Sequence, residues 1–213
     1  MPSCRFAGGT YIHLPKTGGG WVYDRLVDLG LVTETLGDHV PVSDVPRPRG
    51  YVIGSIRHPW AFYRSWYAYQ IMRGTEARWL PRFAKAAGSN DIDAVVRVML
   101  APGSFDVEGY ESMFGSMYSY LVQRYYLERS EIAIDAAIVT ERSNDGLLAL
   151  LSFLGHDFTE DQRRMVANAS PVRNSPTEFT LSDDTKERIL SADSWIVDMF
   201  ALDSGRSYVI PKG

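Results

Sequence analysis

Cysteine is almost missing from this sequence of 213 residues, which contains only Cys4. A single cysteine excludes an intrachain disulfide and a metal site built from several thiolates. The sequence also lacks an apolar run long enough to cross a membrane, and its first residues lack the apolar core of a signal peptide. We therefore expect a cytoplasmic protein without a membrane span.

A surplus of basic residues is missing as well. The chain has 22 lysines and arginines against 26 aspartates and glutamates, which gives a formal net charge of −4. Proteins that bind polyanions usually carry a basic surplus, so we expect no nucleic-acid partner and a small or neutral substrate. Hydrophobic residues make up 45% of the chain and charged residues 23%, as in ordinary globular proteins. The length fits one domain over 1–213.

The first motif is the segment Thr10–Trp21, which reads T-Y-I-H-L-P-K-T-G-G-G-W. It predicts an apolar strand, a glycine turn with one lysine, and a helix that opens at Gly19. Backbone N–H groups and a helix N-terminus at one point suit a phosphate. The loop is not a Walker A motif, because there the lysine follows the glycines and here it precedes them.

The second motif follows an apolar strand over Tyr51–Ile56. Arg57 ends this strand, and Pro59 occupies the first turn of a predicted helix, the helical position that tolerates proline. Ser65 lies two turns into that helix. Arg57 and Ser65 are therefore expected to converge on one anion, with the guanidinium as a planar fork and the hydroxyl as a single donor.

Together the two motifs resemble those of sulfotransferases that use 3′-phosphoadenosine 5′-phosphosulfate (PAPS), and their style is similar to carbohydrate or uronyl 2-O-type members. The resemblance implies an α/β fold of P-loop-NTPase-like type, with three layers and a mainly parallel central sheet flanked by helices. It implies metal-free transfer of a sulfuryl group to an acceptor hydroxyl, with 3′,5′-diphosphoadenosine (PAP) as product. Lys16 is expected to neutralise charge at the bridging oxygen and the 5′-phosphate.

The same resemblance assigns the remaining cofactor contacts. Arg57 and Ser65 would bind the 3′-phosphate, and a late loop would close over the cofactor. One departure is Gly20, because relatives usually carry a threonine or serine hydroxyl at that position. The predicted cofactor-binding residues are Lys16, Thr17, Gly18, Gly19, Gly20, Trp21, Arg57, Ser65, Arg173, Asn174 and Ser175.

A general base must remove the acceptor proton, and histidine is the natural base near neutral pH. His39 lies in a Gly-Asp-His-Val segment, and sulfotransferases that resemble the uronyl 2-O type place their base in a similar segment. We therefore assign His39 as the base, with a plain loop histidine as the alternative and Glu34 or Asp38 in reserve. Of the other three histidines, His13 is expected to pack in the fold. His58 is expected at most to bind a phosphate beside Arg57, and His156 is expected to be exposed.

Two other functions stay open from the sequence. One is a nucleotide kinase or NTPase, which the lysine order disfavours. The other is a non-catalytic module that binds a nucleotide or a protein partner. The acceptor hydroxyl stays open among a carbohydrate, a lipid, a phenol and a peptide tyrosine, and the type of relative favours a carbohydrate.

The spacing of apolar residues and the positions of glycine and proline predict the elements in the rest of the chain. Residues 1–9 read as a lead-in without a motif, and residues 31–50 as turns and loop. A buried strand is expected over 136–140. Helices are expected over 19–29, 59–72, 91–101, 110–128, 143–154, 159–167 and 182–202.

Overall fold

The structure is a computed structural model that describes residues 2–48, 50–76, 79–100, 115–128, 131–169 and 179–211. It confirms the α/β class, with helices flanking a sheet. Contacts divide the chain into two units. The first contains the described residues of Met1–His58, Val122–Arg173 and Asp198–Gly213, and the second those of Pro59–Leu121 and Asn174–Val197. A single domain over 1–213 stays a prediction.

In the described part of the first unit, six strands form one sheet in the order β3-β1-β2-β4-β7-β8. The pairings β2–β4 and β4–β7 are parallel, whereas β1–β2, β1–β3 and β7–β8 are antiparallel. The sheet is therefore mixed, and the prediction of a mainly parallel sheet is not confirmed. The strands are β1 (Pro2–Phe6), β2 (Gly9–Ile12), β3 (Val32–Asp38), β4 (Tyr51–Ile56), β7 (Ala136–Val139) and β8 (Tyr208–Val209).

Three of these strands were not expected from the sequence. β1 occupies most of the predicted lead-in, β3 replaces predicted turns, and β8 has only two residues. β3 is an edge strand with exposed residues at 33–35, and its register with β1 shifts twice. An irregular, polar edge strand gives little alternation of apolar and polar residues, so its pattern is hard to recognise. The missed strands supply all the antiparallel pairings.

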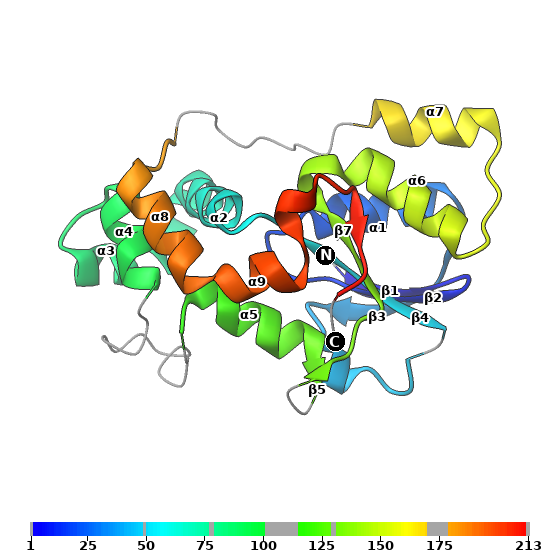
Figure 1. Cartoon of the computed structure of the whole chain (residues 1–213), viewed down its shortest axis with the longest axis horizontal. Helices are drawn as coiled ribbons and strands as arrows, with labels where there is room; N and C mark the ends of the chain where they lie inside the picture. The colour runs from blue at the N-terminus through cyan, green and yellow to red at the C-terminus, as the bar shows by residue number, and fades with distance from the viewer. Residues whose placement is uncertain are drawn as a thin grey trace. The chain divides into compact units, whose positions relative to one another are not determined.

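Helices α1 (Gly19–Asp28) and α6 (Ser143–Phe153) cover one face of this sheet (Figure 1) and confirm the predicted helices over 19–29 and 143–154. Burial of each large aliphatic side chain there contributes about 1.5–3 kcal/mol. The core combines apolar residues of both helices with those of the strands: Trp21, Val22, Leu26, Leu147, Leu150, Leu151, Cys4, Phe6, Tyr11, Ile53, Ala136 and Ile138.

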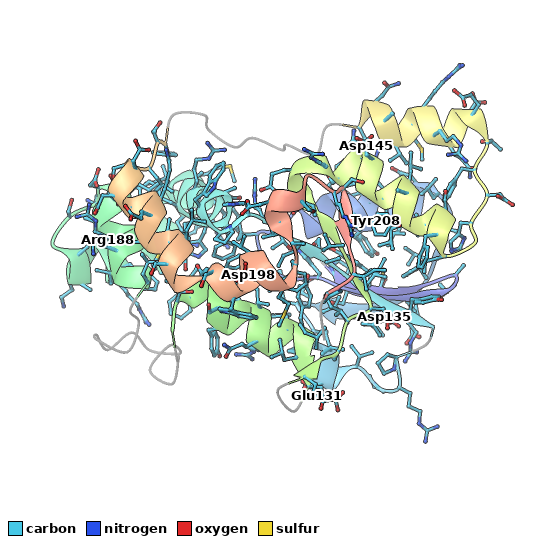
Figure 2. All side chains as sticks on the ribbon, in the orientation of Figure 1. Glu131, Asp135, Asp145, Arg188, Asp198 and Tyr208 are labelled. Atoms are coloured by element: carbon cyan, nitrogen blue, oxygen red, sulfur yellow. The ribbon has the colours of Figure 1, made fainter. Side chains whose placement is uncertain are left out.

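Two hydrogen bonds join the starts of the parallel strands β4 and β7. Asp135, labelled in Figure 2, precedes β7, and its carboxylate accepts a hydrogen bond of 2.7 Å from the Val52 N–H of β4. The Asp135 N–H donates in turn to the Val52 carbonyl at 2.7 Å. These two hydrogen bonds hold the starts of β4 and β7 side by side.

The second unit is helical within its described residues. α2 (Pro59–Arg73) confirms the predicted helix with Pro59 in its first turn, and it packs with α3 (Leu80–Ala87), α4 (Ile92–Met99) and α8 (Asp183–Ala192). Asp91 caps α4 by accepting hydrogen bonds from the N–H groups of Asp93 and Ala94.

The single final helix predicted over 182–202 is wrong. The chain forms α8, capped by Ser182, and then a separate α9 (Ser194–Met199), with Asp193 between them. Asp193 is fully buried, and its carboxylate accepts hydrogen bonds from Ser116, Ser119 and Tyr63. These distant partners fix the backbone at Asp193, and local periodicity does not reveal them.

The remaining described elements complete the chain. α5 (Met117–Tyr126) confirms part of the helix predicted over 110–128, of which 110–114 lie outside the described residues. The prediction is wrong at its end, where Leu127 and Glu128 form a strand instead. α7 (Glu160–Asn168) confirms the helix near 159–167. No described helix combines the length and the apolar character needed to cross a bilayer. The short elements are η1 (Val42–Asp44), η2 (Gly74–Glu76), β5 (Leu127–Glu128), β6 (Glu131–Ile132), η4 (Thr140–Arg142) and η5 (Leu202–Ser204).

Candidate functional site

The strands bring the predicted residues of the first unit to one edge of the sheet. β1 is antiparallel to both β2 and β3, so β3, β2, β4 and β7 all run in the same direction. Their carboxyl ends lead to His39, to the loop with Lys16, to Arg57 and to Thr140 respectively. In α/β sheets this edge is where ligands bind.

The glycine loop connects β2 to α1 as the sequence predicts. Gly18 has φ 74° and stands at the N-cap of α1, which begins at Gly19. No side chain caps this helix and no acidic residue occupies its first turn, in contrast to α4, α7 and α8, whose N-caps are Asp91, Thr159 and Ser182. The first amides of a helix have no acceptor within the helix, so this end suits an external anion.

Two of the glycines are required by their close neighbours. A Cβ at Gly18 would approach Cγ2 of Thr140 to 2.8 Å, and one at Gly19 would lie 1.9 Å from Cδ2 of His13. The positive φ of Gly18 is a further reason for glycine there. Thr140 and the buried imidazole of His13 therefore pack directly against the loop backbone.

Lys16 lies in the left-handed region of backbone space, with φ 66°. Burial, and then the nearby charge of Arg57, lower the pKa of Lys16 to about 8. Arg57 donates a hydrogen bond from Nη1 to the Lys16 carbonyl at 3.2 Å. Two cations thus lie together at the N-terminus of α1, an arrangement that favours a bound anion.

Two carboxylates that the sequence did not lead us to expect lie beside Arg57 and His58; they belong to Glu141 and Asp203. Oε1 of Glu141 lies 3.7 Å from Nε of Arg57 and accepts a hydrogen bond of 3.3 Å from the His58 N–H. Nε2 of His58 lies 3.6 Å from Oδ1 of Asp203. Burial lowers the pKa of His58, and the two carboxylates oppose this shift.

Thr17 turns its side chain away from solvent. It is fully buried, and its hydroxyl donates to the Leu14 carbonyl at 2.8 Å and lies 2.9 Å from Oγ of Ser55. The hydroxyl of Thr140 lies 2.7 Å from the Thr17 carbonyl and 2.9 Å from the Ile56 carbonyl, to which it donates. The Thr17 hydroxyl therefore holds the loop to β4.

His39 follows β3 and also has a left-handed backbone, with φ 53°. Its ring centroid lies 4.7 Å from that of His13. Burial lowers the pKa of His39, a hydrogen bond with the His13 backbone opposes the shift, and the charge of Lys16 adds to it. Nδ1 of His39 is buried without a hydrogen-bond partner among the described residues.

Left-handed backbone is rare for residues other than glycine and is often found at functional sites. Within the described residues the non-glycine positions with positive φ are Lys16, His39, Arg47 and Ala201. Two of these four are the residues that the sequence predicts to be catalytic, and this observation does not depend on the motifs.

The other predicted contacts are not brought together in the same way. Ser65 is half-buried on α2 of the second unit, so its convergence with Arg57 stays a prediction. Trp21 packs in the core, and its backbone N–H donates to the Gly18 carbonyl at 3.0 Å. Gly20 is buried in the first turn of α1. Arg173, Asn174 and Ser175 lie outside the described residues.

The described residues contain no group of histidine, cysteine, aspartate or glutamate side chains able to hold a metal ion. Comparison of the chain with family models, with curated proteins and with solved structures finds no match. The resemblance to sulfotransferases therefore rests on the residues of the two motifs alone.

Proposed function

We propose that the protein is a PAPS-dependent sulfotransferase. The observation that carries the proposal is the pair of cations at the start of α1. Lys16 is partly buried in a left-handed backbone, its pKa is lowered, and Arg57 donates to its carbonyl. A cation kept in such an environment is costly, and an anionic ligand removes the cost.

The two motifs suit a ligand with two anionic ends. Lys16 and the first amides of α1 would hold the 5′-phosphosulfate, and Arg57 with Ser65 the 3′-phosphate. Bound PAPS would supply the sulfuryl group. Lys16 would neutralise the charge that develops on the phosphate oxygen when the bond to sulfur breaks, and fixed donors of this kind typically contribute a hundredfold or more to the rate.

His39 would take the proton of the acceptor hydroxyl. Its lowered pKa keeps the ring neutral at pH 7, as a base must be. We assign the free electron pair of the neutral ring to Nδ1, the ring nitrogen without a hydrogen-bond partner among the described residues. The proton would therefore pass to Nδ1, and the acceptor must reach this buried atom.

The proposal extends to the parts of the sequence prediction that the mixed sheet leaves open. The parallel strands β2, β4 and β7, with the loop between β2 and α1, favour a P-loop-NTPase-like core to which β1, β3 and β8 are added. We further propose a carbohydrate or other small acceptor and a cytoplasmic location. The competing functions are a kinase or NTPase and a non-catalytic binding module.

Calorimetric titration of the whole chain tests the proposal. We expect PAP to bind without Mg²⁺ and at least about tenfold more tightly than 5′-AMP, because the 3′-phosphate adds a charge-assisted contact. Arg57→Ala should weaken PAP far more than 5′-AMP. The exposed Arg82→Ala on α3 is the matched control and should change neither.

Other results would contradict the proposal in distinct ways. Equal affinity for PAP and 5′-AMP would remove the 3′-phosphate site, and binding of ATP that requires Mg²⁺ would favour the kinase. Selective PAP binding without transfer from PAPS to any acceptor tested would favour the non-catalytic module.

A further inference from the structure

The hydroxyl of Tyr126 joins β4 to the glycine loop. It accepts a hydrogen bond of 2.9 Å from the Ser55 N–H and donates to the Ser55 carbonyl at 2.5 Å. The Thr17 side chain and the Leu14 backbone also lie within hydrogen-bonding reach of this oxygen, and both lower the pKa of Tyr126. One phenol oxygen therefore contacts the end of β4 and the loop on both sides of Lys16.

The sequence provides the space for this contact. A Cβ at Gly54 would lie 2.6 Å from Cζ and from the hydroxyl of Tyr126, so glycine is needed for the ring to reach β4. Tyr126 is fully buried, and burial raises its pKa, so the hydroxyl stays protonated and can donate at neutral pH. The side-chain hydroxyl of Ser55 lies 2.9 Å from the hydroxyl of Tyr11.

We propose that Tyr126 is a positioning residue that sets the loop with Lys16 against the end of β4 with Arg57. Lys16 lies between Leu14 and Thr17, the two loop residues that the phenol contacts, and Arg57 lies two residues after Ser55. Without the hydroxyl, the loop loses a shared anchor with β4. The two cations are then no longer held at the spacing that an anion requires.

The positioning role of Tyr126 rests on the proposed function only in its prediction for PAP binding. The first test of this role needs no ligand. The pH dependence of Lys16 acetylation, followed by mass spectrometry, reports the pKa of Lys16. In the wild type this pKa lies at about 8. In Tyr126→Phe we expect it to move upward toward the ordinary value of a lysine, because the loop opens to water and away from Arg57.

Tyr63→Phe is the matched control. Tyr63 is also fully buried, and its hydroxyl is also hydrogen-bonded, to Asp193 at 3.1 Å in the second unit. Both variants should lower the unfolding temperature by a similar amount. Only Tyr126→Phe should shift the Lys16 titration and weaken PAP binding, by about tenfold. An unchanged Lys16 titration in Tyr126→Phe, or an equal shift in Tyr63→Phe, would overturn the positioning role.

Thr17 provides a second pair of variants in case Tyr126→Phe does not fold. Thr17→Val removes the hydroxyl at constant shape and should raise the pKa of Lys16. Thr17→Ser keeps the hydroxyl and should leave the pKa of Lys16 at its wild-type value. An equal pKa of Lys16 in Thr17→Val and Thr17→Ser would also overturn the proposal. Absence of PAP binding by a wild type with the expected Lys16 titration would overturn the proposed function instead and leave the positioning role standing.

Discussion

Each unit buries a cluster of hydroxyl groups, and the two clusters differ in what they surround. The loop cluster of the first unit consists of Tyr11, Thr17, Ser55, Tyr126 and Thr140. The Asp193 cluster of the second unit consists of Tyr63, Ser116, Ser119, Asp193 and Trp195. Both clusters are largely buried and hydrogen-bonded, so burial alone does not distinguish them.

Charge distinguishes them. In the Asp193 cluster three hydroxyls donate to one carboxylate, and these hydrogen bonds oppose the rise in the pKa of Asp193 that burial causes. In the loop cluster the hydroxyls bond to each other and to backbone, and the charge beside them is Lys16, whose pKa is lowered by burial and by a second cation. We therefore expect the Asp193 cluster to contribute to stability and the loop cluster to contribute to the proposed binding site.

The largest expected effect is on activity in Lys16→Gly. Sulfuryl transfer should fall by about a thousandfold, because the charge at the leaving oxygen is lost. Stability should stay equal or rise by up to about 2 kcal/mol, because glycine adopts the left-handed backbone without strain. The measurements are steady-state transfer from PAPS and denaturant unfolding.

Arg47→Gly is the control for Lys16→Gly. Arg47 has φ 48° and is exposed near Arg5, which donates to the Pro46 carbonyl at the opposite edge of the sheet. This variant should gain similar stability and keep full activity. Activity retained in Lys16→Gly, or lost in Arg47→Gly, would contradict the contrast between the clusters.

Asp193→Ala should produce the largest loss of stability without loss of ligand binding. It leaves three buried hydroxyls without their acceptor, which costs about 2–4 kcal/mol in the free energy of unfolding. The exposed Asp198→Ala (Figure 2) is the control and should cost less than about 0.5 kcal/mol. PAP affinity should be unchanged in both, and weaker binding in Asp193→Ala would mean that the second cluster also serves the site.

The same carboxylate gives a pH test. Burial raises the pKa of Asp193 in the folded protein, so the folded state binds its proton more tightly than the unfolded state does. Its contribution to stability is therefore present at low pH and is lost as the pH rises through the raised pKa. Unfolding of Asp193→Ala should lack this decline, and an identical pH dependence would contradict the assignment.

His39→Ala should lower the turnover of PAPS by about a hundredfold and change PAP affinity by less than about threefold, because a base acts on the acceptor proton. His58→Ala is the comparison variant, since His58 has a carboxylate neighbour in Asp203. Loss of turnover in His58→Ala with normal turnover in His39→Ala would move the base to His58.

The pH profile of kcat/KM should be bell-shaped. Its acid limb should lie below about 6.5, the ordinary pKa of histidine, because burial lowers the pKa of His39 and the base must be neutral. Its alkaline limb should lie at about 8, because Lys16 loses its proton there and with it the charge that holds the anion. In Lys16→Arg the alkaline limb should move upward, since the guanidinium stays charged. An alkaline limb that does not move would exclude Lys16 as its source.

Local sequence was sufficient for the elements whose pattern is continuous. The apolar run over Tyr51–Ile56 gave β4, and Pro59 gave the start of α2. β1 and β3 were missed because their pairing is irregular and β3 is exposed, and the break at Asp193 was missed because its hydroxyl partners are 74 to 130 residues away. Distant contacts decide these features.

The same limit applies to the site. The glycine order identified the loop with Lys16, and the strand end identified Arg57. The residues that hold them could not be found locally, because Tyr126 is 71 residues from Ser55 and Thr140 is 123 residues from Thr17. An isolated tyrosine or threonine has no sequence signature for such a role, so only the folded chain reveals it.

Protection of Lys16 by PAP tests the central claim most directly, since it reports the ligand and its site together. Lys16 and the exposed Lys85 of α3 are acetylated in the same sample at pH 8, with and without PAP, and quantified by mass spectrometry. The account predicts that PAP abolishes acetylation of Lys16 at concentrations at which 5′-AMP has little effect, while Lys85 reacts equally throughout. Acetylation of Lys16 at an unchanged rate in saturating PAP would contradict it.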